Sequence, residues 1–218
     1  MESEYFSPSD KIDFIPNVST CFFGVAGCGK SHRMVGWAKE LQSEGKPFLF
    51  ILTKYHEPKQ PDRAEHWMME YKLSSLKDVD ISNPLLFITD EDTTLDDLTN
   101  LITVAMHSGI HVFLDESHFH NDLIEFMRCT NYHNFTASAQ SFLLCPTVDS
   151  SNGISIEDFS NITRKFIGKQ QSIAVTNTLL LGRIGYRLTD ISRGIFFNYP
   201  VLVYKEYLQA LRKSFPND

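Results

Sequence analysis

Eight consecutive residues near the start of the chain constrain its fold more than any other feature. They read GVAGCGKS and fit the pattern G-x-x-x-x-G-K-[ST] at every fixed position. The glycines let the backbone turn so tightly that successive N–H groups point inward at a phosphate. The segment therefore predicts a phosphate-binding loop. Its residues are Gly24, Val25, Ala26, Gly27, Cys28, Gly29, Lys30 and Ser31.

The flanks of this loop have the character that such a site needs. Thr20–Phe23 is a short, mostly apolar run that predicts a buried strand, and apolar residues recur at helical spacing over 31–42. The N-terminal end of that helix adds its positive dipole to the loop. In this setting Lys30 is expected to reach the β- and γ-phosphates of ATP, and the Ser31 hydroxyl to ligate Mg²⁺.

Further apolar runs along the chain predict three more strands and a second helix. The strands are expected at 47–53, 85–89 and 110–114, and the helix at 95–106. Continuous apolar strands that alternate with helices are typical of an α/β fold with a parallel sheet flanked by helices. We therefore expect a P-loop NTPase-type core over residues 19–142. Residues 1–18 suggest a polar N-terminal tail or an edge segment, and 143–160 a long loop.

The apolar run 110–114 ends in two carboxylates, Asp115 and Glu116. A carboxylate there lies at the C-terminal end of a parallel strand, where the ligands of α/β proteins bind. Asp115 is expected to hold Mg²⁺ directly or through water, and Glu116 to act as general base on a hydroxyl or a water. The alternative is an acidic turn that only closes a buried strand, and the nearby phosphate-binding loop disfavours it.

Charge and cysteine usage narrow the class of protein. The formal net charge is −7, and phosphate neutralisation needs a basic face, so a broad nucleic-acid interface is disfavoured, although a narrow channel is not. The four cysteines form no C-x-x-C pair, which argues against a zinc site and a disulfide framework. No signal-peptide pattern opens the chain, and no apolar run reaches the ~18 residues of a membrane span. We expect a soluble, cytoplasmic protein.

The residues after the strand carboxylate resemble a known family. Residues 115–126 read DESHFHNDLIEF. They resemble the D-E-x-H-F segment of type II thymidine kinases, which an acidic helix start and an apolar helix follow. The stretch 22–50 is similar to that family's first strand, phosphate loop, helix and second strand. Residues 199–207, YPVLVYKEY, resemble its closing Y-x-x-V-C-x-x-H-Y stretch.

The resemblance implies roles for residues outside the phosphate-binding loop. It makes Glu116 the catalytic base for a sugar hydroxyl, and places a phenylalanine and a tyrosine beside the nucleoside base. An arginine in the loop near the phosphates and a threonine in a C-terminal strand also match. The implied substrate-binding residues are Arg63, Phe119, Thr176 and Tyr199.

The function implied by this resemblance is ATP-dependent phosphoryl transfer to the 5′-hydroxyl of a deoxynucleoside, with Lys30 and Glu116 as catalytic residues and Mg²⁺ as cofactor. Family members cover their substrate with a small lasso-like subdomain, here expected over 143–218, and are commonly homo-oligomers, often tetramers. The family's lasso holds zinc on four cysteines. Since no cysteine follows Cys145, no structural zinc is expected here. Ala26 also replaces the methionine of the family's loop.

A second interpretation stays open. Residues 115–118 also satisfy the D-E-x-H pattern of DExH-type ATPases and helicases, and 135–138 faintly resemble the S/T-A-T motif that follows it there. In that case Glu116 activates water, and nucleic acid becomes a partner. The chain is too short for the two cores of a full helicase. A descendant that binds nucleotide without catalysis is the third interpretation.

Overall fold

The computed structural model describes residues 5–6, 11–24, 28–52, 66–73, 76, 79–90, 92–115, 133–139, 163–167 and 196–198. In this part of the chain a single sheet contains eight strands in the order β1-β8-β7-β2-β6-β5-β3-β4. The strands are β1 (Tyr5–Phe6), β2 (Thr20–Phe23), β3 (Phe48–Leu52), β4 (Leu85–Ile88), β5 (His111–Asp115), β6 (Phe135–Ala139), β7 (Arg164–Ile167) and β8 (Phe196–Asn198). The helices are α1 (Lys30–Ser43) and α2 (Leu95–His107), with a 3-10 helix η1 (His66–Tyr71).

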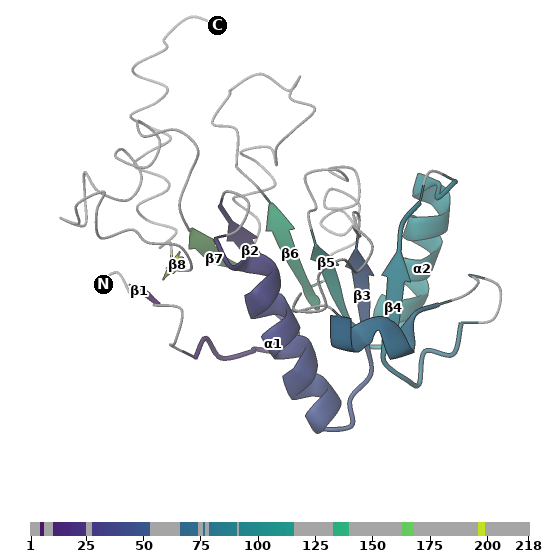
Figure 1. Ribbon diagram of the computed structural model, residues 1–218, viewed down its shortest axis with the longest axis horizontal. Helices are drawn as coiled ribbons and strands as arrows, with labels where there is room; N and C mark the ends of the chain where they lie inside the picture. Colours follow the sequence, from purple (N-terminus) through teal and green to yellow (C-terminus); the bar gives the residue numbers. More distant parts are fainter. Residues whose placement is uncertain are drawn as a thin grey trace, which may run out of the picture.

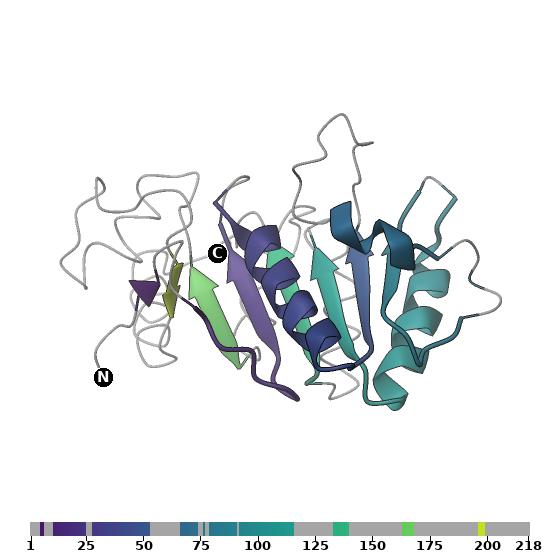
Figure 2. The ribbon, with the colours of Figure 1, turned by 60° about the horizontal axis from the view of Figure 1, so that its bottom comes forward.

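Six neighbouring strands, from β7 to β4, pair in parallel, and β8 and β1 continue the sheet antiparallel. Figure 2 shows the six arrowheads pointing the same way, with α1 in front of the sheet and α2 behind its β4 end. The predicted α/β fold with a parallel sheet flanked by helices is therefore confirmed. The lasso-like subdomain stays a prediction, since most of 143–218 lies outside the described residues. No helix in the described ranges is long and apolar enough to cross a membrane.

The elements expected from apolar runs are present almost to the residue. The strand at Thr20–Phe23 is confirmed, and the strands expected at 47–53, 85–89 and 110–114 are β3, β4 and β5. The helices expected at 31–42 and 95–106 are α1 and α2. Sequence analysis missed β6, β7, β8 and η1. The strand β6 matters most, because it lies between β2 and β5.

The core on the α1 side of the sheet is aromatic. Phe50 of β3 stacks on Phe113 of β5 with ring centroids 5.4 Å apart, and Phe22 of β2 lies 5.2 Å from Trp37 of α1. Such rings bury large apolar areas and dominate core energetics. The opposite side of the sheet carries α2, whose buried residues are Leu98, Leu101, Ile102, Ala105 and Met106. The strands are thus covered on both faces, as a parallel sheet requires.

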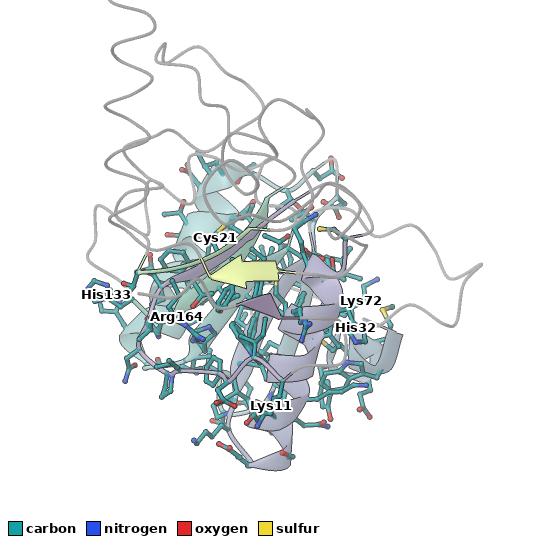
Figure 3. The ribbon with its side chains drawn as sticks, turned by 90° about the vertical axis from the view of Figure 1, so that its left-hand side faces the viewer. Lys11, Cys21, His32, Lys72, His133 and Arg164 are labelled. Atoms are coloured by element: carbon teal, nitrogen blue, oxygen red, sulfur yellow. The ribbon has the colours of Figure 1, made fainter. Side chains whose placement is uncertain are left out.

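Residues 11–18 pack against the core, although the sequence suggested a polar tail or an edge segment. Ile12 is 3% exposed, and its carbonyl oxygen accepts a hydrogen bond of 2.6 Å from Trp37 Nε1. Arg164 of β7 donates to the Asp13 carbonyl at 3.0 Å, and the Phe14 ring lies 5.7 Å from Trp37. Figure 3 shows Lys11 beside α1, where its ammonium contacts Glu40 at 3.1 Å. This N-terminal segment therefore ties α1 to the sheet.

His111 is a buried histidine at the amino end of β5. One ring nitrogen, Nε2, lies 2.9 Å from the Thr136 hydroxyl, and the Phe14 ring packs edge-on against the imidazole at 4.7 Å. The other, Nδ1, has no hydrogen-bond partner among the described residues. Burial disfavours the charged imidazolium and lowers the pKa of His111 from 6.5 to about 3.

This burial predicts acid sensitivity. Between pH 6.5 and about 3 the unfolded chain binds a proton on His111 that the folded protein does not bind. The free energy of unfolding therefore falls as the pH falls through this window. The glutamine in His111→Gln does not titrate. Between pH 7.5 and 5 we therefore expect the free energy of unfolding to fall by about 2 kcal/mol less in this variant than in the wild type. Urea unfolding of both proteins at the two pH values measures this, and parallel losses would contradict it.

Two glycines with open space at the Cβ position make a matched pair. Gly36 lies in α1, and Gly45 follows this helix with φ +68°; an added Cβ meets nothing within 4 Å at either position. Alanine is the better helix former, so Gly36→Ala should stabilise the fold by up to about 1 kcal/mol. Gly45→Ala should destabilise it by about 1–2 kcal/mol, because the left-handed backbone is strained for alanine. Urea denaturation of both variants measures these changes in the free energy of unfolding. A loss of stability in Gly36→Ala would contradict the prediction from helix propensity.

Candidate functional site

Parallel pairing brings the predicted site residues to one edge of the sheet. The loop at Gly24 follows the carboxyl end of β2, Asp115 is the last residue of β5, and β6 ends between them. In Figure 1 the arrowheads of these strands point to the top edge, and α1 begins at that edge. Open α/β sheets bind their ligands at this edge, outside the carboxyl ends of the strands.

The N-terminus of α1 is built differently from that of α2. Its N-cap residue is Gly29, in the left-handed conformation at φ 98°, with no side-chain cap and no acid in the first turn. At α2, Thr94 and Asp97 form a complete capping box, in which each side chain accepts a hydrogen bond from the backbone N–H of the other residue. Among the described residues no side chain caps the first turn of α1, and a helix start that follows a glycine-rich segment suits an anion such as a phosphate. Glycine is needed at position 29 because other residues rarely adopt its backbone conformation.

Lys30 places a cation inside the loop. The residue is 6% exposed, and its ammonium donates a hydrogen bond of 2.7 Å to the Gly24 carbonyl oxygen. The bond joins the first residue of the loop to the lysine near its end. An ammonium at this place suits a phosphate, because charge-assisted hydrogen bonds to phosphate oxygens are stronger than neutral ones. Cys28, two residues earlier in the chain, is buried as well.

Asp115 lies on the α1 face of the sheet. It is 3% exposed, and its Oδ1 accepts a hydrogen bond of 2.5 Å from the Ser138 hydroxyl of β6. Side chains alternate along a strand, so Asp115 shares its face with Phe113, which belongs to the core cluster under α1. The carboxylate and the phosphate-binding loop therefore share both an edge and a face.

The residues present fit Mg²⁺. It prefers hard oxygen ligands and commonly takes one or two protein carboxylates, completing its shell with water and substrate phosphates. The Ser31 hydroxyl and the Asp115 carboxylate provide such oxygens at this edge. Among the described residues no group of three or more His, Cys, Asp or Glu gathers in one place. A site with one carboxylate agrees with that observation.

Several predicted site residues lie outside the described residues. Their roles therefore stay predictions. They are Val25, Ala26, Gly27, Arg63, Glu116, Phe119, Thr176 and Tyr199. Of the other predicted residues, the structure brings Gly24, Gly29, Lys30 and Asp115 to one edge, with Cys28 and Ser31 beside Gly29.

Sequence reasoning missed the role of Ser138. The segment 135–139 reads FTASA, with hydroxyl residues at alternate positions in an otherwise apolar run. This alternation was the available signal, since residues 136 and 138 of a strand must share one face. Both hydroxyls are fully buried, Thr136 against His111 and Ser138 against Asp115.

The chain matches no protein-family model and no curated protein sequence. Solved structures do share its fold. The genome packaging NTPase B204 from Sulfolobus turreted icosahedral virus 2, in complex with AMP, superposes with a TM-score of 0.59 at 10% identity, over 88% of this chain and 96% of that chain. Its complex with ATP-gammaS gives 0.53 at 11% identity, over 86% and 99%.

A second group of similar structures is EssC. The protein containing ATPases 2 and 3 of EssC from Geobacillus thermodenitrificans superposes with a TM-score of 0.52 at 14% identity, over 92% of this chain and 44% of that chain. The chain thus spans less than half the length of this neighbour. At identities this low, the superpositions establish the shared fold alone.

The carboxylate makes a specific prediction about magnesium. Asp115→Asn keeps an oxygen that can accept the Ser138 hydrogen bond but removes the negative charge. Mg²⁺ is expected to raise the affinity of both proteins for an ATP analogue. We expect this gain to be at least about tenfold smaller in the variant than in the wild type. Titration of a fluorescent ATP analogue with Mg²⁺ and with EDTA measures this. Asp80→Asn, an exposed change before β4, is the control and should bind as the wild type does.

Proposed function

We propose that this chain is a P-loop NTPase that binds ATP with Mg²⁺ and transfers its γ-phosphoryl group to water. One observation carries the proposal. The glycine-capped start of α1, the buried ammonium of Lys30 and the buried carboxylate of Asp115 lie on one edge and one face of the sheet. Phosphoryl transfer from a nucleotide needs an anion cradle, a cation and a metal carboxylate in that arrangement.

Each residue of the proposed site has a task in this reaction. The N–H groups at the start of α1 hold the phosphates in line, and Lys30 neutralises the charge that develops on the transferred group. Ser31 and Asp115 would hold Mg²⁺, which would neutralise part of the phosphate charge when bound. Glu116 orients and deprotonates the attacking water, as the residue next to the metal carboxylate. The products are ADP and phosphate.

The fold neighbours support hydrolysis over transfer to a nucleoside. The genome packaging NTPase has been solved in complex with AMP and with ATP-gammaS, and the EssC structure contains two of its ATPases. The superposition with this NTPase in its AMP complex covers 96% of the length of the NTPase. We extend the ATPase chemistry to this chain, as a module that drives work on a macromolecule.

The thymidine kinase resemblance stays a prediction. Its central motif is residues 115–119, of which only Asp115 lies among the described residues. A kinase and a hydrolase share the phosphate-binding loop and the metal carboxylate. They differ in whether a sugar hydroxyl or water attacks, so the labelled product separates them.

The test is a product assay with γ-labelled ATP, Mg²⁺ and a panel of deoxynucleosides, run with and without single- and double-stranded DNA. We expect label in free phosphate and none in a nucleoside monophosphate. Lys30→Ala and Glu116→Gln should each lower turnover by about 100-fold or more, because they remove the cation and the base. Label on a deoxynucleoside would overturn the hydrolase in favour of the kinase.

Lys39→Ala is the matched control for Lys30→Ala. Lys39 lies in the same helix but is exposed, with its ammonium 5.5 Å from the Trp67 ring centre. Its removal should leave turnover within about twofold of the wild type, since exposed cation–π pairs contribute only about 0.5–1 kcal/mol. An equal loss in both lysine variants would indicate a general effect of charge or folding.

A further inference from the structure

The hydroxyl of Ser138, on the neighbouring strand β6, contacts the carboxylate of Asp115, the proposed metal ligand. Ser138 is fully buried on β6, and its Oγ lies 2.5 Å from Asp115 Oδ1. On its other side β6 pairs with β2, where Ser138 is in register with Phe22, two residues before the loop at Gly24. Ser138 therefore stands on the strand between the phosphate-binding loop and the carboxylate.

We propose that Ser138 is a positioning residue that orients Asp115 toward Mg²⁺. This inference rests on the proposed function. The terminal torsion of an aspartate is broad and two-fold, so a carboxylate at a strand end has no fixed plane of its own. A donor held rigidly on the adjacent strand fixes one oxygen and thereby the direction of the other. Partners of this kind commonly set metal affinity without touching the metal.

Thr136 provides an internal comparison. It lies on the same strand and face as Ser138 and is equally buried, but its hydroxyl contacts His111 at the amino end of β5. A purely structural role for buried hydroxyls predicts similar effects from Thr136→Val and Ser138→Ala. A positioning role predicts that only the serine change alters the response to magnesium.

The experiment measures the affinity of a non-hydrolysable fluorescent ATP analogue with EDTA and with Mg²⁺. We expect Ser138→Ala to bind the analogue as the wild type does in EDTA, and to lose about tenfold of the affinity that Mg²⁺ adds. Thr136→Val should keep the full gain from Mg²⁺, even where its unfolding midpoint is lowered. Ser138→Cys keeps the volume with a weaker donor and should fall between wild type and alanine.

The outcomes separate the two proposals. An unchanged magnesium gain in Ser138→Ala, with a wild type that binds and responds, would overturn the positioning role and leave the proposed function standing. If Ser138→Ala does not fold, Ser138→Cys decides, and a wild-type gain there would overturn the role. A wild type that binds no nucleotide at all would remove the proposed function, and this inference with it.

Discussion

The parallel pairing of β6 with both β2 and β5 is the constraint on which the site depends. Adjacent strands lie about 4.8 Å apart, so this insertion separates the loop strand from the carboxylate strand by roughly 10 Å. The loop after β2 and the carboxylate at the end of β5 therefore lie at the same edge of the sheet with β6 between them. The middle strand β6 also supplies the hydroxyl of Ser138 near its carboxyl end, next to Asp115.

Buried polar groups occupy both ends of the β5–β6 pair, with an aromatic layer between them. His111 and Thr136 lie at the amino end, Ser138 and Asp115 at the carboxyl end, and Phe113 between. Burying such groups is costly unless they are hydrogen-bonded, and in each pair a hydroxyl of β6 meets the polar side chain of β5. At the amino end the imidazole stays neutral, which serves stability. At the carboxyl end the buried oxygens face the ligand edge, which serves function.

The sequence predicted the parts of this structure that local signals encode. Long apolar runs gave β3, β4 and β5, and the phosphate-binding motif gave the turn from β2 into α1. The strand β6 was missed because FTASA is short and made largely of small residues, so its hydrophobic period is weak. Strand order is not a local property either. Ser138 therefore gained a meaning only when β6 was seen beside Asp115.

The helix that follows the phosphate-binding loop is fixed by contacts with the N-terminal segment and with the sheet. α1 begins in the loop, and about two turns later Trp37 packs on Phe22 and donates to the Ile12 carbonyl oxygen. A shift of α1 along its axis would break that bond and separate the rings. The bond from Lys30 to Gly24 ties the first turn of the helix to the end of β2. With the helix fixed at both points, the N–H groups of its first turn keep their direction before a phosphate binds, so little free energy is lost to ordering the start of the helix.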